Sequence, residues 1–315
     1  MRLFIPILFL CLPSPAKAQA IDNVRSYHAP GDHYMRLTYD NDFFTATDRY
    51  YTQGIGLEYA SPAVQKSPHN KILLHPFAGS EVAGISIEHN AYTPSNIIPS
   101  TVLYNDHPYT AALMLRAFRI VTDTVRLRRF SATLSLGVLG PHASGKWMQE
   151  SIHRWLDNVQ PGGWKHQLKN DVVINYNIHY EQLLLSAGEY IQLHADAALA
   201  AGTLNNRLSA GFSLVTGYIR SPYLPRHKGV RAYLYAHPQV SAVAYDATLQ
   251  GGIFTTGNTY TIPASQVERF VFTGQAGIVL CCAGLSLEHF YAISSREFST
   301  QESFYWGGLR LGVSF

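Results

Sequence analysis

The chain has 315 residues and a formal net charge of +3 at pH 7, from 24 Lys and Arg against 21 Asp and Glu. A charge this small gives no global basic field and argues against a nucleic-acid partner. Charged residues make up only 14 % of the chain and aromatic residues 12 %. Because soluble domains carry roughly 25 % charged residues, the composition favours a protein that faces lipid.

The amino-terminal segment 1–18 has the pattern of a secretory signal peptide. Arg2 supplies a positive start, an apolar stretch follows it, and residues 16–18 read Ala-Lys-Ala, the small-residue pattern of a cleavage site. Cys11 lies in the apolar stretch, so we expect it to be absent from the mature protein. Residues 19–315 are then expected to form one domain.

Alternating apolar and polar residues dominate the rest of the chain and predict strands. The carboxyl terminus shows the alternation most clearly, with Leu309, Leu311, Val313 and Phe315 on one face and Gly308, Arg310, Gly312 and Ser314 on the other. The same reading predicts twelve strands, at 33–42, 51–59, 82–91, 108–118, 126–138, 172–185, 189–200, 206–216, 230–242, 266–281, 284–295 and 303–315.

An even number of strands is what single-chain bacterial membrane barrels have. Only helices and closed barrels pair every backbone group in hydrocarbon, and after the signal peptide the sequence has no apolar run of the ~20 residues that a membrane helix needs. The predicted fold class is therefore all-β, a transmembrane antiparallel up-and-down barrel of about twelve strands with a short extracellular helix.

With the amino terminus in the periplasm, the odd-numbered connections face outward, and these include 43–50, 92–107, 139–171 and 243–265. The long third one contains an expected helix at 146–158, bounded by Pro and Gly residues and laid over the barrel mouth. Its apolar stripe is Met148, Ile152 and Trp155, at i, i+4 and i+7. The periplasmic connection at 60–81 is unusually long for this topology.

Two adjacent cysteines, Cys281 and Cys282, remain in the mature chain. Neighbouring residues on a strand point to opposite faces, so we expect no disulfide framework.

Two sequence blocks carry the chemistry. The first runs Asp40-Asn41-Asp42-Phe43-Phe44 and then Thr47 to Gly54, which includes Tyr51-Thr52-Gln53-Gly54. The second is Gly137 to Pro141 followed by Gly145, Gln149 and His153. Taken alone, Asn-Asp before a turn is ordinary turn chemistry, but the two blocks together resemble those of the outer-membrane lipid A 3'-O-deacylases over the whole barrel length.

The resemblance implies an outer-membrane esterase that removes the 3'-linked acyloxyacyl group of lipid A at the extracellular face. It further implies a catalytic group of Asn41, Asp42, Thr52, Gln149 and His153, which activates water without an acyl-enzyme. The implied cofactor is Ca²⁺, the implied partners are lipopolysaccharide and outer-membrane lipids, and we expect a monomer.

The side-chain chemistry fits these roles. His153 is suited to be the general base, and Asp42 supplies a hard carboxylate oxygen for Ca²⁺, which polarises an ester carbonyl. Thr52 and Asn41 offer donors or ligands, and Gln149, one turn before the histidine, orients the imidazole or the water. Strand alternation places Asp42 and Thr52 toward the lumen and Asn41 toward lipid, unless a bulge intervenes.

Other polar residues receive other interpretations. His179 shares one strand face with Asn175, Asn177 and Glu181, which is the usual lining of a barrel lumen. The segment 90–108 contains no Lys or Arg, so phosphate recognition would fall to Arg49, Lys146, Arg154 or Lys165.

Two alternatives stay open. The first is a non-catalytic or transport barrel whose polar rim merely keeps the loops soluble. The second is an outer-membrane phospholipase of another type, which would need a nucleophilic serine beside a histidine. No Ser-His pair with a supporting context is evident in the sequence.

Overall fold

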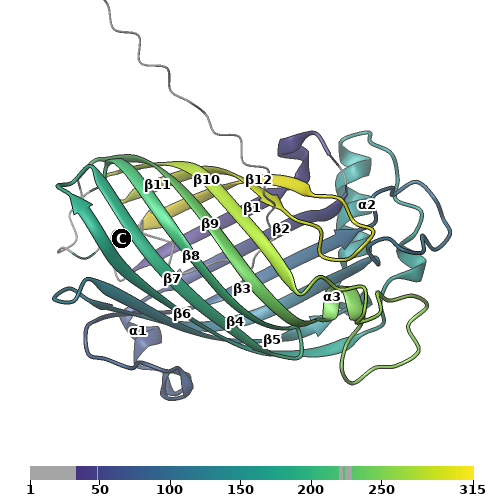
Figure 1. Cartoon of the computed structure of the whole chain (residues 1–315), viewed down its shortest axis with the longest axis horizontal. Coiled ribbons are helices and arrows are strands. Elements are labelled where there is room, and N and C mark those ends of the chain that lie inside the picture. The colour runs from purple at the N-terminus through teal and green to yellow at the C-terminus, as the bar shows by residue number, and fades with distance from the viewer. Residues whose placement is uncertain (1–32, 48, 220–222, 224–228) are drawn as a thin grey trace, which may run out of the picture.

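The computed structural model describes residues 33–47, 49–219, 223 and 229–315. Twelve antiparallel strands close into a barrel in which each strand pairs with its neighbours in sequence and the first pairs with the last (Figure 1). The strands are β1 (Tyr34–Asn41), β2 (Tyr50–Ala60), β3 (Ser80–Thr93), β4 (Thr110–Asp123), β5 (Arg128–Leu139), β6 (Asp171–Ala187), β7 (Ile191–Gly202), β8 (Asn205–Tyr218), β9 (Arg231–Asp246), β10 (Phe270–Cys282), β11 (Leu285–Ser294) and β12 (Phe304–Ser314).

Each of the twelve predicted strands corresponds to one observed strand, so the predicted fold class is confirmed. The predicted signal peptide at 1–18 lies outside the described residues. In the described part of the chain, no helix combines the length and apolar character needed to span a membrane.

Short helices lie in the connections between the strands. The α-helices are α1 (Pro62–Gln65), α2 (Gly145–Trp155) and α3 (Ala247–Gln250), and the 3-10 helices are η1 (Asp42–Thr45), η2 (Pro68–Ile72), η3 (Pro141–Ala143) and η4 (Trp164–His166). α2 and α3 lie together at one end of the barrel, opposite the carboxyl terminus (Figure 1). We call this the long-loop end, because the connections 42–49, 94–109, 140–170 and 247–269 gather there.

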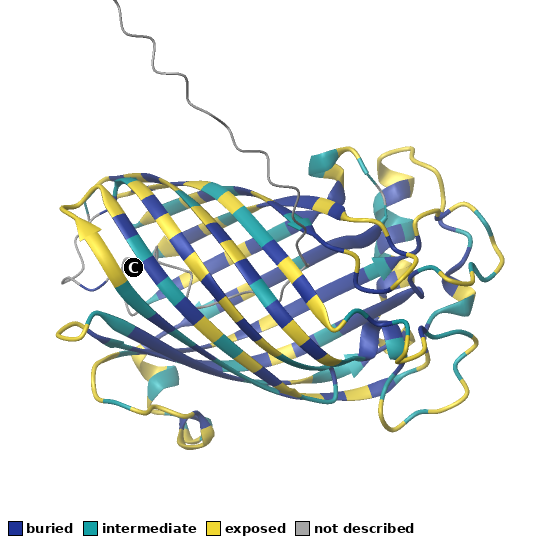
Figure 2. Cartoon of the chain, viewed as in Figure 1, coloured by how far each residue is buried: buried dark blue, intermediate teal, exposed yellow. Residues whose placement is uncertain are grey.

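Burial alternates along the strands, as Figure 2 shows. On β12, Leu309, Leu311 and Val313 are exposed on the outer face, whereas Arg310 between them faces the lumen and pairs with Glu288 of β11. Apolar-out and polar-in is the pattern of a barrel whose outer face is solvated by lipid. The predicted sidedness of the carboxyl-terminal strand is therefore confirmed.

The lumen is filled by buried polar and charged side chains. Arg36 and Glu58 form an ion pair at 2.9 Å between Nη2 and Oε2, Tyr34 donates to the same Glu58, and Arg116 pairs with Glu88. Buried charges are tolerated when each has a partner of opposite sign and further hydrogen bonds. These pairs tie neighbouring strands together across the inner face of the wall.

The long connection between β2 and β3 folds back against the outside of the barrel. Leu73 is buried there against Phe130 and Ala132, which lie on the outer face of β5 because Ser131 and Thr133 face the lumen. Its backbone is fixed to β6 by Tyr176, whose hydroxyl donates to the carbonyl of Ile72 at 3.0 Å. This contact explains why the connection is longer than a turn requires.

The cysteines agree with the sequence-based expectation. Cys281 is buried and Cys282 is exposed, and both are free thiols. They are the last two residues of β10, where alternation separates their side chains.

Candidate functional site

A block of loop structure packs on the outer face of the barrel wall at the long-loop end. Its buried core joins Ala91 of β3 and Ala111 of β4 with Tyr109, Ala143 and Trp164. The two strand alanines face outward, because their neighbours on the same strands line the lumen. The part of the third long connection that includes Ala143 and Trp164 therefore lies against the outside of the wall, whereas Leu168 near its end packs with Met114 and Val173 on the lumen side. The expected position of the helix over the barrel mouth was wrong.

The helix α2 in this block is shorter than the predicted range 146–158. It covers Gly145–Trp155 and is followed by a turn in which Asp157 has a left-handed backbone conformation, with a φ of +53°. The amide of Asn158 donates to the carbonyl of His153 at 2.8 Å, and the amide of Leu156 donates to that of Ile152 at 2.9 Å. Such bonds around a left-handed residue satisfy the last carbonyls of a helix and stop it.

The buried stripe of α2 is polar. Gly145, Gln149 and His153, at i, i+4 and i+8, are its buried residues, while Trp147 and Trp155 are 66 % and 83 % exposed. Of the expected apolar stripe, Met148 and Ile152 are half-buried and Trp155 is exposed, so this stripe is not the most buried face of the helix. Exposed tryptophans on a membrane barrel are suited to the headgroup level, and a polar stripe buried on a surface helix indicates a specific task.

The amide of Gln149 is held in one orientation. The indole Nε1 of Trp164 donates to its Oε1 at 2.6 Å, and both side chains are 1 % exposed. Close packing fixes the pair, because a Cβ on Gly145 would lie 2.5 Å from the Cβ of Ala111 and 2.8 Å from the Trp164 ring. The Nε2 of Gln149 is buried and has no hydrogen-bond partner among the described residues.

The imidazole of His153 is held by the end of its own connection. Its Nδ1 lies 2.6 Å from the carbonyl oxygen of Val159, and the side chain is 7 % exposed. A carbonyl oxygen only accepts, so Nδ1 carries the proton in this contact. In the neutral ring, Nε2 is then the basic nitrogen.

The first sequence block forms a tight turn at the end of β1. Asn41 caps η1, with its Oδ1 accepting from the amide of Phe43 at 2.7 Å. Asp42 is 2 % exposed, and its Oδ2 accepts from the amide of Arg49 at 2.5 Å. The turn therefore fixes the carboxylate of Asp42 beside the start of β2.

A β-bulge turns Thr52 away from the lumen. Tyr51 pairs with Tyr92 and Gln53 pairs with Ala91, which leaves Thr52 as the extra residue. The Tyr51 hydroxyl donates to Asp40 in the lumen at 3.0 Å, whereas the Thr52 hydroxyl lies 2.8 Å from that of Thr93.

The predicted sidedness was therefore wrong for Tyr51 and Thr52, which were expected outward and inward. Tyr51 faces the lumen, and Thr52 faces the outer side together with Gln53. A bulge adds one residue to the strand, so the alternation of inward and outward side chains is interrupted at that residue. Asn41 lies on the outer face, as alternation predicts, since its neighbour Asp40 faces the lumen.

The strand register brings the two sequence blocks to the same part of the outer wall. Asn41 is paired with Gln53 on β2, and Gln53 is paired with Ala91 on β3. Ala91 packs in the cluster that contains Trp164, and Trp164 is bonded to Gln149. Asn41 and Gln149, more than 100 positions apart in sequence, are thus connected through two strand pairings and one packed cluster.

Gln53 and Trp164 belong to this region but were not among the predicted site residues. Trp164 follows Pro161-Gly162-Gly163, which the sequence reading treated only as a helix boundary. Gln53 stood in an expected outward position of β2, where an amide that is 1 % exposed is unusual for a lipid-facing strand. An uncharged polar residue at such a position was the available signal.

The basic residues considered for phosphate recognition are at the surface, and three of them contact other side chains. Arg49 forms an ion pair with Glu302 at 2.8 Å, Lys146 lies 3.8 Å from Glu150, and Arg154 donates to Ser151 at 3.3 Å. Lys165 is exposed on η4. Surface ion pairs contribute roughly 0–1 kcal/mol, so these side chains exchange partners at little cost.

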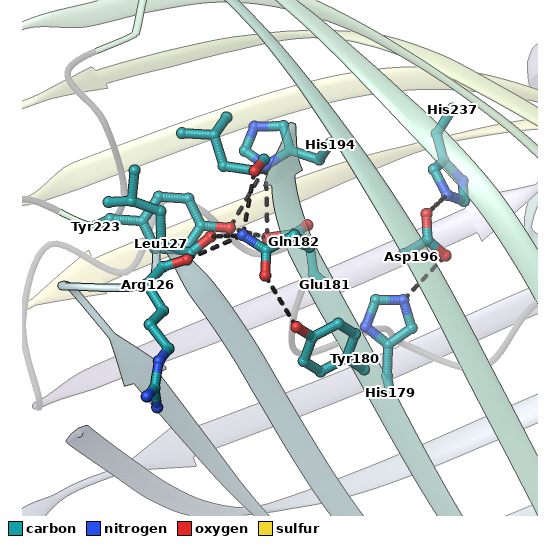
Figure 3. Close-up of polar contacts among 11 residues, drawn as sticks. Arg126, Leu127, His179, Tyr180, Glu181, Gln182, His194, Asp196, Tyr223 and His237 are labelled. Atoms are coloured by element: carbon teal, nitrogen blue, oxygen red, sulfur yellow. Dashed lines mark hydrogen bonds and ion pairs between the residues drawn. The ribbon is translucent and has the colours of Figure 1, made fainter. Parts of the chain in front are cut away.

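His179 lies in the lumen, as predicted. Figure 3 shows it beside Asp196, whose carboxylate is 3.2 Å from Nε2 of His179 and 2.6 Å from Nε2 of His237. In a second group of contacts, the hydroxyl of Tyr223 donates a hydrogen bond to Glu181 at 2.9 Å. These contacts link β6, β7 and β9 and give His179 a structural task within the barrel.

The closed barrel, its exposed apolar outer face and its polar lumen define an integral outer-membrane β-barrel protein. A family model described as "Outer membrane protein LpxR" matches residues 3–315. The chain therefore belongs to the LpxR family of outer-membrane proteins.

The solved structure of a family member supports the same fold. LpxR from Salmonella typhimurium superposes with a TM-score of 0.74 at 16 % identity, covering 90 % of this chain and 100 % of that one. The β-domain of the Bordetella autotransporter BrkA gives a TM-score of 0.46 at 9 % identity, with 90 % and 98 % covered. No curated relative matches the chain in sequence.

Proposed function

We propose that this protein is an outer-membrane esterase that hydrolyses the 3'-linked acyloxyacyl group of lipid A in the outer leaflet. One observation carries the proposal: the buried face of α2 carries a histidine and a glutamine, and the strand register through Gln53 and Ala91 puts the Asn41-Asp42 turn on the same outer face of the wall. Membership of the LpxR family and the shared barrel fold support it. Because one chain closes the barrel, we propose that the monomer is active.

His153 acts as the general base in this proposal. The contact of Nδ1 with Val159 orients the ring and puts the proton of the neutral imidazole on Nδ1, so Nε2 is the nitrogen that takes a proton from water as the water oxygen attacks the ester carbonyl. The bond between the carbonyl carbon and the sugar oxygen then breaks. The imidazolium returns its proton to the leaving alkoxide, so the products are a free fatty acid and a sugar hydroxyl.

The oxygen donors near β1 fit the implied Ca²⁺. Asp42 contributes a buried carboxylate, and Asn41 and Thr52 contribute neutral oxygens, the ligand type that calcium prefers. Among the described residues no group of three or more His, Cys, Asp or Glu side chains forms a metal cluster, so Asp42 would hold the ion with neutral oxygens. When bound, Ca²⁺ would polarise the ester carbonyl.

Transport through the barrel is the less supported alternative. The ion pair of Arg36 with Glu58 and the contacts of Asp196 with two histidines occupy the lumen and join its strands. A path for solutes would have to separate such buried charged pairs, which costs about 3–5 kcal/mol when one partner is left alone.

Mass spectrometry of lipid A tests the proposed reaction directly. Lipid A from cells that express the protein should lose the mass of the 3' acyloxyacyl group, and lipid A from cells without it should not. Purified barrel in detergent should release the same group from added lipid A. Intact lipid A in the presence of heat-modifiable, folded barrel would reject the esterase.

Replacing Trp164 should weaken the reaction by misorienting Gln149. Trp164→Phe keeps an aromatic ring in place of the indole but removes the Nε1 donor, and one hydrogen bond of about 0.5–1.5 kcal/mol corresponds to roughly a 2–10-fold lower rate. Trp155→Phe, on the exposed face of the same helix, should keep the wild-type rate. Equal rates for the two variants would show that the Trp164 contact does not orient the amide for catalysis.

A further inference from the structure

We propose that Gln53 is a further catalytic residue of this site, whose amide donates to the ester carbonyl oxygen as negative charge develops on it. Gln149 supplies the second donor. The inference rests on the proposed function and adds to it how the tetrahedral intermediate is stabilised.

The first argument is the burial of an unused donor. Gln53 is 1 % exposed, and its Nε2 has no hydrogen-bond partner among the described residues. Leaving a buried donor unsatisfied costs about 1–3 kcal/mol. A side chain in a lipid-facing position of a strand could avoid this cost by being apolar, as Leu57 is on the same face of β2. The amide is therefore suited to a ligand that arrives from outside the chain.

The second argument is position. Gln53 is the register partner of Asn41 on one side and of Ala91 on the other. It follows the bulged Thr52 directly, so the bulge places Thr52 and Gln53 together on the outer face. Gln53 thus lies between the turn that holds Asp42 and the block that holds α2.

The third argument is a second buried amide with the same property. Gln149 has its Oε1 occupied by Trp164, which fixes the amide and leaves Nε2 as its donor, and this Nε2 also has no partner within the described residues. Gln53 is paired with Ala91, Ala91 packs in the cluster that contains Trp164, and Trp164 donates to Gln149. The proposal directs both amides to one carbonyl oxygen, because preorganised N–H donors stabilise an oxyanion.

The chemistry of the step is balanced without any oxidant or reductant. Attack of water on the carbonyl carbon moves the π-electron pair to the carbonyl oxygen, while His153 takes the proton. The two amides donate to this oxygen, which carries more charge in the intermediate than in the ester. Collapse of the intermediate restores the C=O bond and expels the sugar oxygen, which receives the proton from His153.

The experiment compares three variants of the full-length barrel on purified lipid A. Gln53→Met preserves length and removes both donors, and kcat should fall on the order of 10²-fold with little change in KM. Gln53→Glu should be slower still at neutral pH, but its rate relative to wild type should rise as pH falls, because a protonated carboxyl donates one hydrogen bond. Gln192→Met, which changes a buried amide in the lumen on β7, should keep the wild-type kcat.

The outcomes separate the two proposals. If wild type cleaves lipid A and Gln53→Met matches it in kcat, the role of Gln53 is rejected and the esterase stands. If Gln53→Met and Gln192→Met lose activity equally, with no pH dependence in the Gln53→Glu ratio, the effect is structural and the role is also rejected. If folded wild type releases no acyl group, the proposed function fails and the inference fails with it.

Discussion

His153→Asn is expected to leave the barrel folded and to lower the rate of 3' deacylation by a factor on the order of 10²–10⁴. Asparagine can still donate to the carbonyl of Val159, which now accepts from Nδ1 at 2.6 Å, but it has no nitrogen that can take a proton from water. The loss should appear in kcat, because the base acts after the lipid is bound.

The matched control for this variant is His179→Asn. His179 is also a buried histidine, but it contacts Asp196 in the lumen, so its replacement should change activity much less. Both variants are to be assayed after gel electrophoresis shows equal amounts of heat-modifiable barrel. Near-normal release of the 3' acyl group by His153→Asn would show that another group is the base.

Asp42→Asn is expected to lower activity on the order of 10²-fold at limiting Ca²⁺, with partial recovery as the Ca²⁺ concentration rises. The amide keeps an oxygen that can accept from the backbone of Arg49, as the carboxylate does at 2.5 Å, so the turn should persist. What is lost is the negative charge that a divalent cation requires.

Asp40→Asn provides the control for the metal prediction. Asp40 is a buried carboxylate two residues earlier on β1, but it accepts from Tyr51 in the lumen. Its variant should show the calcium dependence of wild type. Full activity of wild-type barrel after exhaustive chelation would remove calcium from the mechanism, whatever the behaviour of Asp42→Asn.

Most of the fold follows from the alternation in the sequence. The outer band of a membrane barrel must be apolar and the lumen polar, so a period of two marks every strand. The ends of the strands are less well determined by the sequence. β9 runs to Asp246, beyond the predicted 242, and β10 begins at Phe270, after the predicted 266. The reason is that pairing beyond the membrane depends on the neighbouring strand and no longer on lipid.

The sequence named the residues of the candidate site but did not predict their position on the barrel wall. The two sequence blocks named Asn41, Asp42, Thr52, Gln149 and His153, and the register together with one packed cluster puts both blocks on the same outer face of the wall. The side of the wall on which Tyr51 and Thr52 lie was not predictable, because the bulge at Thr52 interrupts the alternation between Gln53 and the loop. The buried face of α2 was also unexpected, since helical periodicity favours burying the apolar stripe.

The outer-face position of Gln53, Ala91 and the α2 block has a consequence for how a lipid reaches the protein. A substrate embedded in the same leaflet meets this surface by two-dimensional diffusion and does not have to be pulled from its neighbours. Withdrawing one acyl chain of ~12 methylene groups from hydrocarbon into water costs roughly 10 kcal/mol, at ~0.8 kcal/mol for each. The proposed reaction centre on the flank of the barrel would avoid that extraction, and its encounter rate would be set by the fluidity of the membrane and the surface density of the lipid.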